Sequence, residues 1–91
     1  MCTMIMETTS VLGSATGPKG WFKLKRANVS FDHPFNAPLD HALNIDFVNE
    51  ELGLAERVTV ELSPDSARQL VAAIETALNR GEMEIEPVTR V

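Results

Sequence analysis

Two short runs of alternating side chains, residues 27–33 and residues 41–47, constrain the fold of this chain more than any other feature. In each run, apolar residues occupy every second position and mostly polar residues fill the positions between them. Successive residues of a β-strand point to opposite faces, so the pattern predicts two strands that each have one apolar face. Pro34 and Pro38 lie between the runs and cannot donate hydrogen bonds to a sheet. The two runs are therefore predicted to form a β-hairpin.

The hairpin has one antiparallel register that matches apolar residues with apolar residues. It pairs Phe31 with Leu43, Val29 with Ile45 and Ala27 with Phe47. A shift by one residue would set apolar side chains opposite polar ones, so the pattern selects this register. The same register places His33 opposite His41, and opposed residues have Cβ atoms about 4.5–5.5 Å apart. Two imidazoles at that separation are close enough to share one metal ion.

Alternation elsewhere predicts further strands on both sides of the hairpin. The expected strands cover residues 3–12, 21–32, 41–48 and 57–62. Residues 13–20 contain three glycines and are predicted to form a flexible loop. Phe22 and Leu24 are out of phase with the apolar residues that follow them. A β-bulge at Lys25 and Arg26 would restore a single apolar face.

A helix is predicted to follow the last strand. Ser63 is a good capping residue, Pro64 suits the first helical position, and Asp65 complements the positive end of the helix dipole. An apolar stripe at helical spacing follows, formed by Ala67, Leu70, Val71, Ile74, Ala77 and Leu78. Gly81 is predicted to end the helix.

These elements predict an α+β fold, ββββα, in which a four-stranded antiparallel meander has one C-terminal helix packed on one face. We expect residues 1–81 to form this single domain. Residues 82–91 are expected to form a tail that is either frayed, an edge strand or an arm that docks on a second copy. A chain of 91 residues buries a modest core, so a homodimer that shares apolar surface is expected.

Composition excludes some functions and favours a location. A net charge of -5 argues against nucleic-acid binding, which needs clustered Lys and Arg. No apolar run approaches the roughly 20 residues that a membrane span requires, and the start lacks a signal-peptide pattern. A single cysteine fits a reducing compartment. We therefore expect a cytoplasmic protein without nucleic-acid or membrane partners.

The residues best suited to metal binding or catalysis are predicted to lie at one end of the sheet. The meander brings Cys2 close to His33 and His41, and Asp32 and Asp40 flank the histidines. A thiolate and two imidazoles form a ligand set for zinc, copper or iron. In a metalloenzyme, His33, His41, Asp32 and Asp40 would be the catalytic candidates, with an Asp that tunes a ligand or acts as a base.

Other interpretations of the same residues stay open, and the sequence does not decide whether the protein is an enzyme. The histidines can fasten the loop, and Asp32 and Asp40 can be turn residues. The chain can be a non-catalytic binding or assembly domain that forms a homodimer. It can also be a metal-free cyclase or isomerase that uses His33 or His41 as acid or base on a small-molecule ligand. Asp46 and Glu61 on the polar face offer a further carboxylate pair.

Several motifs give the chain a family resemblance. They are Met1-Cys2-Thr3, Gly20-Trp21-Phe22, Phe31-Asp32-His33-Pro34, Asp40-His41-Ala42-Leu43-Asn44-Ile45-Asp46-Phe47 and Leu62-Ser63-Pro64. With these motifs the chain resembles a family of small actinobacterial proteins of unknown function. The resemblance implies a bacterial, soluble, cytoplasmic protein that is accessory to specialised metabolism. It implies no particular activity.

Overall fold

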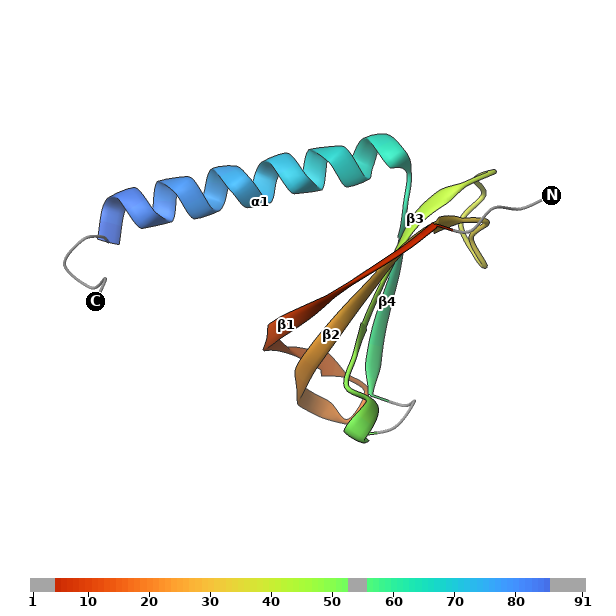
Figure 1. Ribbon diagram of the computed structural model, residues 1–91, viewed down its shortest axis with the longest axis horizontal. Coiled ribbons are helices and arrows are strands. Elements are labelled where there is room, and N and C mark those ends of the chain that lie inside the picture. The colour runs from red at the N-terminus through yellow and green to blue at the C-terminus, as the bar shows by residue number, and fades with distance from the viewer. Residues whose placement is uncertain (1–4, 53–55, 86–91) are drawn as a thin grey trace.

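Four antiparallel strands and one long helix make up the fold. The computed structural model describes residues 5–52 and 56–85 (Figure 1). The elements are β1 (Ile5–Gly17), β2 (Gly20–Asp32), β3 (Ala42–Val48), the short 3-10 helix η1 (Glu50–Leu52), β4 (Arg57–Leu62) and α1 (Pro64–Ile85). The strands pair in the order β1-β2-β3-β4, so the predicted meander and its ββββα class are confirmed.

The central hairpin of β2 and β3 has the predicted register. Phe31 pairs with Leu43, Val29 with Ile45 and Ala27 with Phe47. Since paired residues point to the same side, the sheet has one apolar face, which we call the helix face because α1 leaves on that side. The opposite side is called the polar face. It carries Thr8, Arg26, Asn28, Ser30, Asn44, Asp46, Arg57, Thr59 and Glu61.

The first hairpin differs from the prediction in two respects. Residues 13–20 are not a loop, because β1 continues to Gly17 and only Pro18 and Lys19 form the turn. Gly20 then adopts a positive φ of 109°, which suits glycine in a tight turn. The predicted bulge at Lys25 and Arg26 is also wrong, because the extra residue lies in β1 between Ser10 and Gly13.

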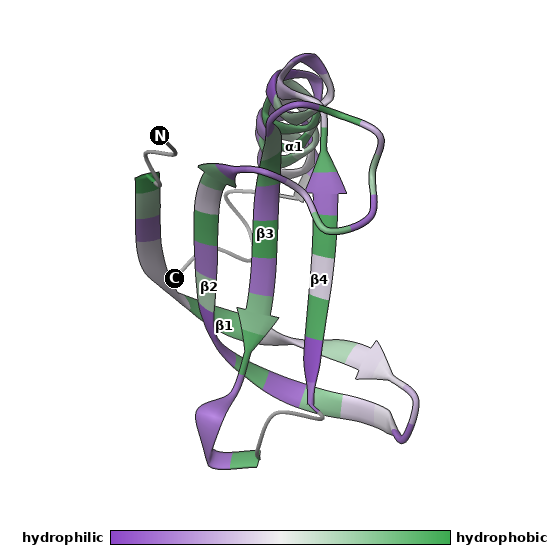
Figure 2. Ribbon diagram, turned by 90° about the vertical axis from the view of Figure 1, so that its right-hand side faces the viewer, coloured by the Kyte–Doolittle hydropathy of each residue, from purple (hydrophilic) through white to green (hydrophobic). Residues whose placement is uncertain are grey.

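The position of this bulge explains why Phe22 is out of phase with the rest of β2. With no extra residue in β2, Phe22 and Leu24 have the same parity as Arg26 on the polar face. The bulged hairpin bends so that its end passes beneath β3 and β4 (Figure 2), and β1 comes close to β4. Phe22 is only 7% exposed inside this bend. The phase change therefore marks a sheet that curls, with apolar residues inside the curl.

A buried asparagine ties the end of β3 to the bent hairpin. The Asn49 side chain donates a hydrogen bond to the carbonyl oxygen of Lys23 at 3.1 Å. Its Oδ1 accepts a hydrogen bond from the backbone N–H of Glu51 at 3.0 Å. Both polar atoms of this buried amide are thus paired, as burial requires.

The helix begins as predicted but ends later. The Ser63 Oγ accepts a hydrogen bond from the backbone N–H of Ser66 at 3.1 Å, which is an N-cap. Gly81 does not end the helix, which continues to Ile85. A glycine inside a helix costs about 1 kcal/mol relative to alanine, which the good helix formers around it offset. Residues 82–85 are therefore helical and not an edge strand, whereas residues 86–91 lie outside the described residues.

The helix meets the sheet only near its own beginning. Its packing on the sheet is to β3 and β4, and the remainder extends away from the helix face (Figure 1). The helix and the sheet thus form two arms that join at Ser63, an arrangement we call the V. Within the described part of the chain, no helix combines the length and hydrophobicity that a membrane span requires.

Candidate functional site

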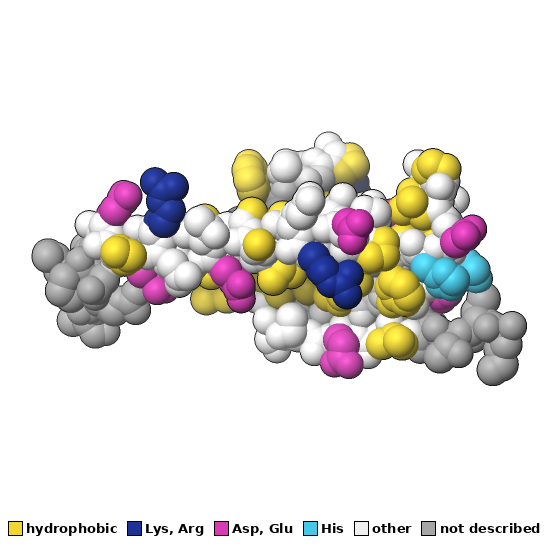
Figure 3. Space-filling view, turned by 90° about the horizontal axis from the view of Figure 1, so that it is seen from above, with side chains coloured by type: hydrophobic (Ala, Val, Ile, Leu, Met, Phe, Trp, Pro, Cys, Tyr) yellow, Lys and Arg dark blue, Asp and Glu magenta, His cyan; other side chains and the backbone are white. Residues whose placement is uncertain are grey.

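The two histidines lie at the end of the sheet, where the chain leaves β2 and enters β3. Their imidazole rings are stacked, with centroids 4.9 Å apart and 26° between the planes. Phe31 also stacks on His41, with a centroid distance of 5.5 Å and 10° between the planes. The expected opposition of His33 and His41 is therefore observed, as part of an exposed stack of three rings at one end of the molecule (Figure 3).

Hydrogen bonds hold one ring of this stack. The Asp32 carboxylate accepts a hydrogen bond from the backbone N–H of the next residue, His33, at 2.7 Å. The His33 Nδ1 lies 2.8 Å from the carbonyl oxygen of Asp40. Because a carbonyl can only accept, Nδ1 is the donor in this contact. The contacts of Asp32 and Asp40 thus fasten the ends of the loop between β2 and β3.

The stacking of the two imidazoles sets the directions of their nitrogen lone pairs. The nitrogen lone pairs of an imidazole lie in the ring plane, so stacked rings do not direct them at an ion between the rings. In the part of the chain that the structure describes, no three His, Cys, Asp or Glu side chains form a group that could hold a metal ion. Cys2 lies outside the described residues. The zinc, copper or iron site of Cys2, His33 and His41, and the catalytic roles of His33, His41, Asp32 and Asp40, stay predictions.

Glu61, near the end of β4, holds the tip of the loop between β2 and β3. Its carboxylate accepts hydrogen bonds from three consecutive backbone N–H groups, those of Phe35 at 2.6 Å, Asn36 at 3.1 Å and Ala37 at 2.8 Å. The hydrogen bonds from Ala37 and Phe35 hold the pKa of Glu61 below its ordinary value, against a smaller opposing effect of burial. The loop is therefore folded over the polar face. Backbone donors carry no sequence signal, which is why Glu61 could not be assigned this role from the sequence.

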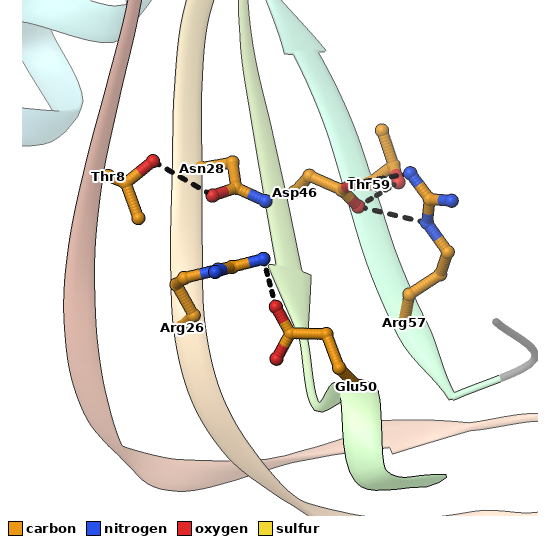
Figure 4. Close-up of polar contacts among 7 residues, drawn as sticks. All are labelled: Thr8, Arg26, Asn28, Asp46, Glu50, Arg57 and Thr59. Atoms are coloured by element: carbon orange, nitrogen blue, oxygen red, sulfur yellow. Dashed lines mark hydrogen bonds and ion pairs between the residues drawn. The ribbon is translucent and has the colours of Figure 1, made fainter. Parts of the chain in front are cut away.

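Asp46 is engaged separately, on the next row of the polar face. It forms an ion pair with Arg57 and accepts a hydrogen bond from the Thr59 hydroxyl at 2.7 Å (Figure 4). Asp46 thus binds Arg57 and Thr59, whereas Glu61 binds the loop, so the two carboxylates of the predicted pair have different partners. A cavity of about 310 Å³ opens beside Asp46, lined by Arg26, Asn28, Asp46, Val48, Asn49, Glu50 and Arg57. Its two arginines are each paired with a carboxylate, Arg26 with Glu50 and Arg57 with Asp46.

The inside of the V is a larger and more apolar feature. A groove of about 410 Å³ lies where α1 leaves the sheet, with walls of Val29, Phe31, Leu43, Ile45 and Leu62 from the sheet and Leu70, Val71 and Ile74 from the helix. Beyond the groove the two walls diverge. Leu70, Val71, Ile74 and Leu78 are 42% to 56% exposed although they form the apolar stripe of the helix. Hydrophobic side chains are visible along and beneath the helix in Figure 3.

Large apolar side chains of α1 are thus open to solvent in a single chain. Exposed apolar patches of more than a few hundred Å² mark binding surfaces. Among the described residues, the buried apolar side chains are Phe22, Ala27 and Ala42, and no large side chain is fully buried. The sequence pattern correctly predicted the apolar face of the sheet and the apolar stripe of the helix. It predicted that the two pack against each other along their length, whereas they diverge beyond the groove. The inside of the V is the strongest candidate for a functional surface.

Comparison with known proteins gives one match. No curated protein and no solved structure shows significant similarity to the chain. The match to a protein family covers residues 1–87, which is nearly the whole chain. The chain belongs to DUF6295, a family of unknown function.

Proposed function

We propose that this protein is a non-catalytic assembly domain that functions as a homodimer, with the inside of the V as its surface of association. The observation that carries the proposal is the exposed apolar stripe of α1, which faces an apolar sheet without covering it. Burial of apolar surface contributes about 25 cal/mol per Å², so an uncovered stripe is a strong drive to associate.

The dimensions of the chain agree with an open arrangement of helix and sheet. The accessible surface is 7206 Å², whereas a compact monomer of 10.0 kDa is expected to expose about 5,200 Å². The radius of gyration is 15.7 Å, against about 12 Å for a compact domain of 91 residues.

The solution mass tests this proposal, with a pair of matched variants. Ile74 lies in the apolar stripe and Thr76 lies on the opposite side of the same helix. An Asp at either position has the same helix propensity, but only Ile74→Asp places a charge inside the V. Sedimentation equilibrium should give a dimer for the wild-type protein and for Thr76→Asp, and a monomer for Ile74→Asp.

Two results would contradict the proposal in different ways. A wild-type chain that stays monomeric at high micromolar concentration would overturn the homodimer. A dimer that persists unchanged in Ile74→Asp would show that the chains associate through another surface, and the V would lose its assigned role. Circular dichroism of each variant, compared with the wild type, shows whether the helix and sheet are retained.

A further inference from the structure

We infer that the cavity on the polar face binds a small zwitterion of the amino acid class, with its carboxylate towards β2 and its ammonium group towards β3 and η1. The cavity has a volume of about 310 Å³, at the lower end of the range for small-molecule sites. It lies on the opposite side of the sheet from the V, so it is separate from the surface proposed for association. It therefore adds a ligand site to the proposed assembly domain.

The β2 side of the cavity supplies hydrogen-bond donors. Arg26 and Asn28 are two residues apart on β2, so both side chains point to the polar face. The Asn28 Oδ1 accepts a hydrogen bond from the Thr8 hydroxyl at 3.1 Å, which turns the amide N–H groups towards Asp46 (Figure 4). A guanidinium carries five N–H donors, and the Glu50 carboxylate can accept only some of those of Arg26. The remaining donors of the two side chains suit a carboxylate.

The opposite side of the cavity supplies hydrogen-bond acceptors. Asp46 lies on β3, and Glu50 is the first residue of η1. Asp46 accepts hydrogen bonds from Arg57 and Thr59 through three of its four lone-pair positions. Glu50 pairs with Arg26 through its Oε2 atom. Both carboxylates therefore keep acceptor positions for an ammonium group, which donates up to three hydrogen bonds.

The short helix η1, which carries Glu50, is held in place by its neighbours. The Oδ1 of Asn49 accepts a hydrogen bond from the backbone N–H of Glu51 at 3.0 Å. The carbonyl oxygen of Asn49 accepts one from the N–H of Leu52, also at 3.0 Å. Lys25 of β2 binds the Glu51 carboxylate at 2.8 Å. This wall of the cavity is thus formed before a ligand arrives, which reduces the entropy that binding costs.

The charges of the cavity decide which class of ligand fits. Among the described residues, two arginines and two carboxylates line it, so their formal charges cancel. A simple anion would be repelled by the carboxylates, and a simple cation would be repelled by the guanidinium groups. A zwitterion satisfies both sides at once. Val48 lies between Arg26 and Arg57 in the sheet and offers an apolar contact to a short aliphatic side chain.

NMR titration with L-valine and its two half-molecules tests this inference. Isovalerate keeps the carboxylate and the aliphatic group, whereas isobutylamine keeps the ammonium group and the aliphatic group. Each probe is added into the millimolar range to the isotope-labelled chain, and the amide shifts locate the site. We expect shifts centred on Asn28, Val48 and Glu50. The affinity for L-valine should be about tenfold higher than for either half-molecule, because only L-valine makes both charged contacts.

Substitutions on each side of the cavity make the test specific. Arg26→Gln should weaken the binding of L-valine about tenfold without weakening that of isobutylamine. Glu50→Gln should weaken the binding of L-valine by a similar factor without weakening that of isovalerate. Both side chains are about half exposed, so the fold should be retained, and the amide spectrum shows this directly. Arg80→Gln on α1 is the matched control and should leave all three affinities unchanged.

Three results would overturn the inference. An absence of localised shifts with L-valine would show that the cavity binds no amino acid of this kind. An equal affinity for either half-molecule would show a site for a simple ion. Unchanged binding to both Arg26→Gln and Glu50→Gln would place the ligand elsewhere. Each result can be read on a monomer or a dimer, so failure here leaves the proposed association of the chains untouched.

Discussion

Truncation of Leu78 should cost far more stability than its environment in one chain allows. Leu78 is 56% exposed, so less than half of its side chain is removed from water within the chain. Full burial of a leucine contributes about 1.5–3 kcal/mol, so partial loss in Leu78→Ala should cost about 1 kcal/mol. The higher helix propensity of alanine reduces this cost further. An isolated chain would therefore barely register the substitution.

In the proposed dimer, where Leu78 is buried against the second chain, the same substitution leaves a cavity. Core truncations of leucine to alanine cost about 2–5 kcal/mol per site, and the dimer contains two such sites. The assay is urea unfolding followed by circular dichroism at several protein concentrations. Dimer unfolding requires a midpoint that rises with protein concentration, and Leu78→Ala should lower that midpoint strongly.

Phe22→Ala is the reference for this experiment. Phe22 is buried within the bend of a single chain, so its truncation should cost about 3–5 kcal/mol, of the same order as Leu78→Ala. A loss of about 1 kcal/mol or less in Leu78→Ala, together with a midpoint that does not depend on concentration, would refute the reasoning. In that case the apolar stripe of α1 would be exposed to solvent in the working protein.

Four further substitution experiments address other parts of the fold. The pKa of Glu61 in the folded state is lower than its ordinary value of 4.5. Its hydrogen bonds therefore stabilise the loop fully at a pH above 4.5, and this stabilisation is lost as the pH falls through the lowered pKa. Glu61→Gln should therefore speed amide exchange in the loop near neutral pH and remove the acid-induced change, which hydrogen exchange by NMR can measure. Gly20→Ala should destabilise the first hairpin by about 1–2 kcal/mol, because φ is positive there, and thermal unfolding checks this. Ser63→Ala should cost about 1 kcal/mol in urea unfolding because the N-cap hydrogen bond is lost, with Ser63→Thr as the control. The predicted metal site requires near-stoichiometric zinc, copper or iron in the purified protein and its loss in His33→Ala and His41→Ala, which elemental mass spectrometry determines.

The central hairpin was predictable because one of its faces is apolar along both strands. Any other register of Val29 and Ile45 would expose apolar side chains, so local pattern and three-dimensional pairing agree. The helix start was predictable for a similar reason, since Ser63 and Pro64 act within a single turn. In both cases the decisive interactions are close in sequence or repeat regularly.

The elements that could not be predicted depend on contacts that the local pattern does not contain. The phase change at Phe22 predicts a bulge in β2, whereas the bulge lies in β1 and the hairpin curls. Gly81 predicts a helix end, but the helix continues past it to Ile85. The loop contacts of Glu61 involve backbone donors, which every sequence offers equally. The angle between helix and sheet depends on what fills the space between them.

The open V also has a consequence for how the chain survives in a cell. If only a second copy covers the helix, each newly made chain is vulnerable to proteases until it meets another. Its lifetime then depends on its own abundance, with rapid loss when synthesis is slow and protection once copies accumulate. A damaged chain that keeps α1 would still capture an intact partner. A mutation that damages the sheet of one copy would therefore also impair the dimer that this copy forms. A mutation that removes the helix would impair only the mutant chain, because that chain would no longer associate.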